Sequence, residues 1–306
     1  MKRYQRAIDQ DTPGVMPWQI RRLTQNGGQA IEGGVVIEEP LEVRLDGKPV
    51  AVLMRTPGME KELATGFSLG EGIIADLADI ALVRHCGRVV ADEASVPEAS
   101  GTEAATPDAL DESRNRVDIT LMPGSSPSVA HRETVTLIRS GCGRTDVGAL
   151  AQDLLPVNGQ VRIEMEVLSH LPAQMTRQQE AYRTAGGIHA AAVFDARGRV
   201  IVVCEDIGRH NAVDKAMGYC LLRGIPLADK IVVSTGRASY DMVAKGVRLG
   251  VPVLASISSP TSMAVELAEA LGCTLLGYLR GKTLNVYTHG WRIISRTQDP
   301  KEGEGA

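Results

Sequence analysis

The sequence predicts an α/β protein with two domains, in which the C-terminal domain contains a largely parallel sheet and a smaller N-terminal domain is mostly β. Three observations support this prediction. The 306 residues are enough for two domains of ordinary size. Hydrophobic residues make up 43% of the chain, so each domain can bury a core. In the second half of the chain, short apolar runs alternate with helical patterns, which is typical of α/β proteins.

The N-terminal domain is expected over residues 31–165, after a flexible tail of polar residues, 1–30. Residues 41–56 contain two alternating runs joined at Asp46-Gly47, a pair that favours a hairpin turn. The elements expected after it are a helix over 61–74 and strands near 81–90 and 116–122.

The segment between those last two strands, residues 92–115, is acidic and rich in Ala, Ser and Pro. Such a composition buries little apolar surface, so we expect a surface loop.

The C-terminal domain is expected over residues 166–295, with the domain break near 161–170 and a tail at 296–306. A hairpin over 191–206 should open it. The alternating pattern then predicts a helix over 211–223, a strand over 230–234, a helix over 239–249, a strand over 251–257, a helix from Pro260 with Ser259 as its cap, and a strand over 273–279. Units of this size imply crossover connections and a largely parallel sheet.

Polar, glycine-containing segments follow three of these strands. In open α/β sheets, ligands bind beyond the carboxyl ends of the strands. Glycine lets the backbone approach a phosphate, and arginine pairs with one. Taken alone, each segment is also compatible with a turn and a solvated arginine; three at one edge favour a phosphate-bearing ligand. These segments are Glu205 to His210, Ser234 to Arg237 and Ser258 to Ser262.

Composition excludes several other classes of protein. The formal net charge of −4 argues against general binding of nucleic acid. No apolar run is long enough to span a membrane, and the first residues lack the apolar core of a signal peptide. Five cysteines at irregular spacing are typical of a reducing compartment, so we expect a cytoplasmic protein. The scattered histidines and the lack of CxxC predict no metal held directly by the protein.

Cys142 is the candidate nucleophile, in a loop over residues 139–146. Gly141 and Gly143 leave it unshielded, and the cations of Arg139 and Arg144 favour the thiolate. A structural role for this cysteine remains an equal alternative from the residues alone.

Three segments resemble the formate dehydrogenase accessory sulfurtransferase family. They are residues 186–195 (GGIHAAAVFD), 205–219 (EDIGRHNAVDKAMGY) and 234–246 (STGRASYDMVAKG). Residues 38–58 and 251–289 are also similar to that family. The resemblance covers about residues 38–292 and leaves out the acidic loop and both tails.

The resemblance implies a C-terminal three-layer domain with a cytidine-deaminase-like fold, a homodimer, and a sulfur carrier. Such a carrier accepts sulfur as a persulfide, here on Cys142, from a cysteine desulfurase. It passes the sulfur to the bis-molybdopterin guanine dinucleotide molybdenum cofactor, which is then inserted into the catalytic subunit of formate dehydrogenase. The candidate cofactor-binding residues are Tyr278, Leu279, Arg280, Gly281, Lys282, Thr283, His189, Arg209, His210, Gly236 and Arg237.

One position departs from the family's pattern. The usual loop is Cys-Gly-x-Cys-Gly, but Thr145 stands in place of the second cysteine. One sulfur suffices for a persulfide, so Cys142 can still serve. Two alternatives stay open: a chaperone that binds the cofactor or the apo-dehydrogenase without moving sulfur, and a nucleotide-modifying enzyme on the same fold.

Overall fold

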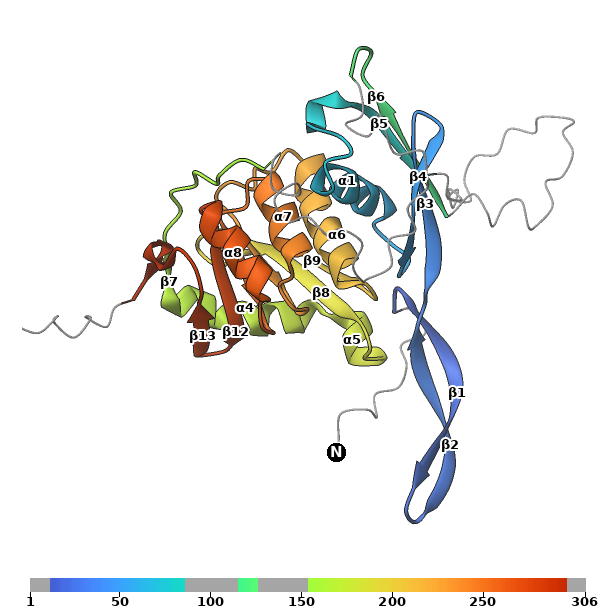
Figure 1. Ribbon diagram of the computed structural model, residues 1–306. Coiled ribbons are helices and arrows are strands. Elements are labelled where there is room, and N and C mark those ends of the chain that lie inside the picture. The colour runs from blue at the N-terminus through green and yellow to red at the C-terminus, as the bar shows by residue number, and fades with distance from the viewer. Residues whose placement is uncertain (1–11, 86–114, 126–153, 296–306) are drawn as a thin grey trace, which may run out of the picture.

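The computed structural model describes residues 12–85, 115–125 and 154–295 (Figure 1). The described chain forms a small N-terminal sheet with one helix and a larger C-terminal sheet covered on both faces. The α/β fold class is confirmed. No helix within the described ranges is long and apolar enough to cross a membrane. The predicted acidic loop, 92–115, lies outside the described residues except for Asn115.

The N-terminal sheet has four strands in the order β4-β3-β6-β5. The expected hairpin is confirmed, with Asp46 and Gly47 at positive φ (48° and 76°), as a tight two-residue turn requires. Alternate strand residues and helix α1 close a separate apolar core. The elements are β3 (Glu39–Leu45), β4 (Lys48–Arg55), α1 (Glu60–Gly70), β5 (Ile80–His85) and β6 (Arg116–Leu121).

The predicted N-terminal tail, 1–30, is wrong from residue 15 onward, and its residues 1–11 lie outside the described residues. β1 (Val15–Thr24) and β2 (Gly27–Val36) pair antiparallel over ten residues and form an arm that projects from the body (Figure 1). Most side chains of this arm are exposed, so its sequence lacks the alternation of apolar and polar residues that marks a half-buried strand. Backbone pairing and the packing of its base against the C-terminal unit hold it instead.

The C-terminal sheet has six strands in the order β13-β12-β11-β10-β8-β9. It is less parallel than predicted, because only β10, β11 and β12 are joined by parallel pairs. The expected β8–β9 hairpin and the β12–β13 hairpin add antiparallel pairs at the two sides. The strands are β8 (His189–Phe194), β9 (Val200–Asp206), β10 (Ile231–Ser234), β11 (Val253–Ser256), β12 (Thr274–Arg280) and β13 (Thr283–Val286).

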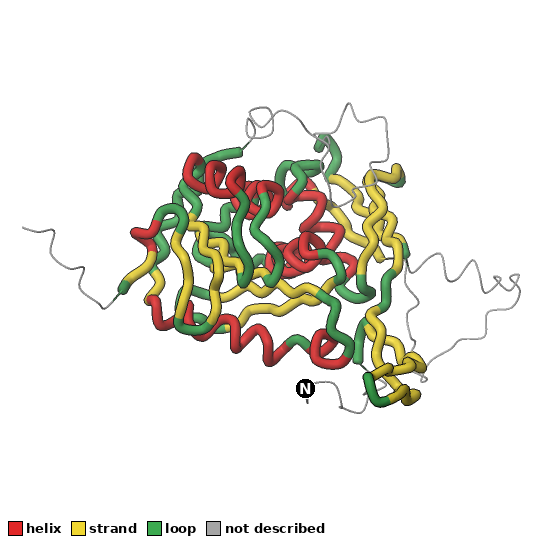
Figure 2. The backbone as a smooth tube through the Cα atoms, turned by 60° about the horizontal axis from the view of Figure 1, so that its bottom comes forward, coloured by secondary structure: helices red, strands yellow, loops and turns green. Residues whose placement is uncertain are grey.

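Helices cover both faces of this sheet and make three layers, as Figure 2 shows. Side chains alternate along β8: Ala191 and Val193 join one core, and Ala190, Ala192 and Phe194 join the other. The first core packs on α6 (Arg209–Leu222), α7 (Tyr240–Arg248) and α8 (Ser262–Ala270), and the second on α4 (Met165–Gln178).

The predicted domain break coincides with a helix. α4 begins in this region and the short α5 (Glu180–Thr184) follows it, while residues before α4 pack with the C-terminal unit. Leu154 and Val157 join its core, and β7 (Ile163–Glu164) pairs with β14 (Ile293–Ile294). Residues 154–165 therefore belong with the C-terminal unit and not, as predicted, with the N-terminal domain.

The predicted start of α8 is also wrong. The helix begins at Ser262, and its cap is Thr261, whose side chain accepts a hydrogen bond from the Ala264 N–H. Ser259 and Pro260 instead extend along the loop after β10, since Pro260 forms a bridge with Ala238.

Candidate functional site

The carboxyl ends of four strands meet at one edge of the C-terminal sheet. β9, β10, β11 and β12 share a direction because β8 lies antiparallel between β9 and β10. The register places Ser234 opposite Ser256, and His189 opposite Asp206. The polar segments that follow these strands therefore lie side by side, where α/β sheets bind ligands.

Gly236 lets the loop after β10 approach the start of α6. A Cβ atom at Gly236 would lie 2.7 Å from the Cβ atom of Arg209, so a larger residue would displace the arginine. The Gly236 N–H donates to Ser234 Oγ (3.2 Å), and its carbonyl accepts from Ser256 Oγ (2.6 Å). This loop is therefore fixed against the next strand while it supports the Arg209 side chain.

Arg209 brings to this edge of the sheet a positive charge whose hydrogen-bond donors are not all paired. Its Nε atom is buried and has no hydrogen-bond partner among the described residues. Arg237, two positions after Thr235, is exposed to solvent. A buried guanidinium nitrogen without a partner is costly unless a ligand satisfies it, and phosphate oxygens are suited to do so.

His189 and His210 flank this arginine as neutral groups. The Nδ1 atom of His189 lies 3.2 Å from Thr235 Oγ1, and the Nε2 atom of His210 lies 3.3 Å from Ser239 Oγ. Burial, aided by the Arg209 charge, lowers the pKa of His189 and lowers that of His210 to about 4. In the described part of the chain, they belong to no cluster of three or more potential metal ligands. They can exchange hydrogen bonds with a ligand without adding charge.

The turn between β12 and β13 brings a second set of cations to the edge. Arg280 pairs with Thr283 across the turn, and Gly281 adopts φ 58°. Arg280 and Lys282 are both exposed, and the Arg280 guanidinium lies 5.7 Å from the ring centre of Tyr278. Their exposure leaves both cations available to an anionic ligand.

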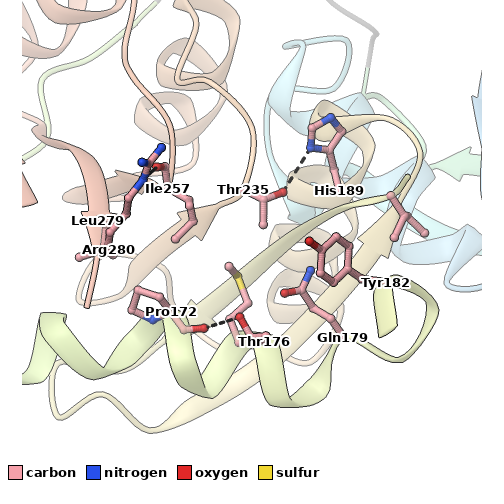
Figure 3. A pocket seen from close by; sticks show the side chains of 11 residues that line it. Pro172, Thr176, Gln179, Tyr182, His189, Thr235, Ile257, Leu279 and Arg280 are labelled. Atoms are coloured by element: carbon pink, nitrogen blue, oxygen red, sulfur yellow. Dashed lines mark hydrogen bonds between the residues drawn. The ribbon is translucent and has the colours of Figure 1, made fainter. Parts of the chain in front are cut away.

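A cavity of about 410 Å³ opens at the same edge, on the α4 face of the sheet (Figure 3). One wall is formed by Pro172, Met175, Thr176 and Gln179 of α4 and its C-cap, with Tyr182 of α5. The opposite wall and the floor come from the sheet and the loops at its edge, with Ile188, His189, Thr235, Ile257, Leu279 and Arg280. A volume of this size accommodates a small organic ligand or part of a larger one.

The structure divides the predicted binding residues into three groups. His189, Leu279 and Arg280 line the cavity. The second group lies at the start of α6 and in the loop after β10 and does not line the cavity: Arg209, His210, Gly236 and Arg237. The third group lies in the β12–β13 hairpin, also outside the cavity lining: Tyr278, Gly281, Lys282 and Thr283.

The α4 and α5 residues of the cavity were missed by the sequence prediction. Pro172, Met175, Thr176 and Gln179 recur at intervals of three and four residues, which places them on one face of a helix. That periodicity was available in the sequence. The sequence prediction nevertheless placed no helix between the domain break near 161–170 and the hairpin over 191–206.

Three cysteines lie in the described part of the chain, and all three are buried. Burial raises the pKa of Cys204 and Cys273 to about 12 and that of Cys220 to about 11. A thiol with such a pKa is almost wholly protonated near neutral pH and is a poor nucleophile. Cys142, with its predicted loop 139–146, lies outside the described residues, as does Cys86.

Comparison with known proteins gives one consistent family. Residues 36–294 match the model of the FdhD/NarQ family. A protein named sulfur carrier protein FdhD from Mycobacterium tuberculosis is 40% identical over 265 residues, which cover 85% of this chain and 91% of that protein. A protein of the same name from Nocardia farcinica is 36% identical over 282 residues, covering 90% and 94%.

A solved structure shows the same fold. The crystal structure of a putative formate dehydrogenase accessory protein from Desulfotalea psychrophila superimposes with a TM-score of 0.71. It covers 92% of this chain and 100% of its own, at 23% sequence identity. The arrangement of elements is therefore shared although most residues differ.

Proposed function

The chain belongs to the FdhD/NarQ family, and on this premise we propose that it carries sulfur on Cys142 to the bis-molybdopterin guanine dinucleotide molybdenum cofactor. A cysteine desulfurase supplies the sulfur. The catalytic subunit of formate dehydrogenase receives the sulfurated cofactor. The names of the relatives, sulfur carrier protein and formate dehydrogenase accessory protein, support the carriage of sulfur and the link to formate dehydrogenase.

The observation that carries the assignment of Cys142 is the burial of the other candidate thiols. Cys204, Cys220 and Cys273 each have a raised pKa and lie inside the C-terminal unit. A carrier thiol must reach a donor protein and must ionise easily. Of the remaining two, Cys142 has the glycine neighbours and nearby arginines that these demands favour, and Cys86 stands in an apolar stretch.

The proposed chemistry needs one thiolate. The Cys142 thiolate attacks the outer sulfur of the donor's persulfide, a new S–S bond forms on Cys142, and the donor's cysteine leaves as its thiolate. In the second step, this S–S bond breaks, and Cys142 is released as a thiolate. The outer sulfur becomes a sulfide ligand when a reduced molybdenum centre supplies the two electrons.

The sheet edge supports the cofactor as the substrate of this transfer. The cofactor carries diphosphate groups and planar rings. Arg209, Arg237, Arg280 and Lys282 bring cations to the edge for the former, and the cavity has the volume for the latter. The unpartnered Nε atom of Arg209 supports an anionic ligand at this edge.

Thr145 favours a second candidate function, because the family's second loop cysteine is missing. If transfer depends on two thiols, the chain binds cofactor or apo-dehydrogenase as a chaperone and moves no sulfur. The two functions differ in whether Cys142 becomes a persulfide.

Intact-protein mass spectrometry after incubation with a cysteine desulfurase and cysteine tests the proposal. We expect the wild type and Cys86→Ser to gain the mass of one sulfur atom, and Cys142→Ser to gain none. Reduction should remove the added mass. An unmodified wild type would reject the carrier function and leave the chaperone in its place.

A further inference from the structure

The interior of the cavity differs in character from the cationic edge beside it. Met175, Ile188, Ile257 and Leu279 give it apolar walls. His189 has a lowered pKa and stays neutral, and the single charged lining residue in the described chain, Arg280, is exposed. An uncharged group fits inside, and an anionic group fits at the side where Arg280 meets solvent.

Gln179 presents a side-chain amide to this cavity that bonds to no other described side chain or backbone group. The residue is only 4% exposed, and it faces the cavity beside Tyr182 (Figure 3). Its backbone N–H donates to the Thr176 carbonyl, and its own carbonyl accepts from the Arg183 N–H. Its side-chain amide has no hydrogen-bond partner within the described ranges. Its amide atoms are not among the fully buried unpaired atoms of the described residues, so they are open to the cavity and free to bond to a ligand that enters it.

The backbone that carries Gln179 is held firmly. Gln179 joins α4 to α5, and the carboxylate of Glu205 accepts hydrogen bonds from the Ala181 and Tyr182 N–H groups, both at 2.9 Å. These bonds come from strand β9, so they fix α5 to the sheet. The amide is therefore presented from a defined position and pays little further entropy when a ligand binds.

We propose that Gln179 is a specificity-determining residue, whose amide recognises an uncharged planar ring bearing a hydrogen-bond donor next to an acceptor. The amide oxygen accepts from a ring N–H, and its NH₂ group donates to the adjacent ring carbonyl. This inference rests on the proposed function, because the cofactor contains two rings with such an edge, guanine and pterin. The cavity takes one of them, with the phosphate group next to Arg280.

Calorimetric titration of the full chain tests the inference with three probes: GDP, neopterin and ribose 5-phosphate. Gln179→Met keeps the length of the side chain and removes the amide. It should weaken binding of the ring that occupies the cavity about tenfold, the cost of one unpaired buried group. Binding of ribose 5-phosphate, which has no ring base, should not change. Gln178→Met, an exposed neighbour, is the matched control and should bind all probes as the wild type does.

The probe that is weakened identifies the source of the ring: GDP indicates guanine, and neopterin indicates pterin. The inference is overturned if the wild type binds neither probe, if Gln179→Met binds both unchanged, or if it weakens ribose 5-phosphate equally. Thermal melting of each variant shows whether a loss comes from unfolding. Persulfide formation on Cys142 is measured separately, so failure of the carrier function would not be mistaken for failure of this site.

Discussion

His210 lies in the first turn of α6 at the sheet edge, where burial and the charges of Arg209 and Lys245 lower its pKa to about 4. An unfolded histidine titrates near 6.5. Between these two values the unfolded chain binds a proton at this position and the folded chain does not. Stability contributed by the neutral histidine is therefore complete above about pH 6.5 and is lost as the pH falls toward 4.

We predict that His210→Gln reduces the loss of stability on acidification by up to about 3 kcal/mol. Glutamine can still bond to Ser239 but takes up no proton. Urea denaturation of both proteins at several pH values between 4 and 7 measures the difference. Parallel stability curves for the variant and the wild type would show that His210 titrates normally in the folded chain.

At this scale, the sequence predicted the residues of the cationic edge and the sheet side of the cavity, His189, Leu279 and Arg280, but not the α4 and α5 residues of its other wall. Arg209 and Gly236 follow strands in the sequence, so their meeting at one edge could be inferred from topology. Gln179 follows no strand, and helical spacing places it on a face of α4 without showing that this face lines a cavity. Its proposed role depends on facing the cavity, and the packing of α4 and α5 against the sheet decides which side chains do so.

Helices α1 and α6 cross with their backbones in close approach. A Cβ atom at Gly218 of α6 would lie 1.9 Å from the carbonyl oxygen of Glu62, and one at Gly66 of α1 would lie 2.0 Å from that of Asp214. Because backbone atoms cannot move aside as a side chain does, neither glycine tolerates a methyl group without separation of the helices.

We predict that Gly218→Ala destabilises the protein by about 3 kcal/mol or more, since it overpacks a backbone contact. Gly70→Ala is the matched control on the same helix: its Cβ would lie 3.2 Å from Cγ of the Lys245 side chain, a contact that a shift of a few tenths of an ångström relieves, and no backbone atom blocks it. Chemical denaturation should show a small change for the control. Equal stability of Gly218→Ala and the wild type would mean that the helices do not pack this closely.

Among the elements, hairpins and alternating α/β units were predicted because their signals are local. The Asp46-Gly47 turn needs only its own residues. α4 was missed although Leu168, Leu171 and Met175 recur at helical spacing, partly because Pro172 interrupts a helical pattern and no capping side chain marks the start. Most residues of the β1–β2 arm are exposed, so apolar and polar residues do not alternate along it. Its strands could therefore not be predicted from hydrophobic periodicity.

At the scale of the whole molecule, buried charges join the two units. Lys215 forms an ion pair with Asp206 at 2.7 Å, and the same carboxylate accepts a hydrogen bond from the Thr56 N–H of the N-terminal unit. Lys245 binds both Asp214 and Glu71, at 2.9 Å each. Removing one partner of such a network leaves an uncompensated buried charge. Sequence reasoning could not pair these groups, because they lie on different elements.

The central claim is that Cys142 carries sulfur to a formate dehydrogenase, and the most direct test is activity of that enzyme in cells. A strain lacking its own copy of this factor would receive the wild type, Cys142→Ser or Cys86→Ser, with protein levels checked by immunoblot. We predict that formate dehydrogenase activity returns with the wild type and Cys86→Ser and is lost with Cys142→Ser, because a hydroxyl cannot hold a persulfide sulfur. Full activity in cells that carry Cys142→Ser would contradict the account.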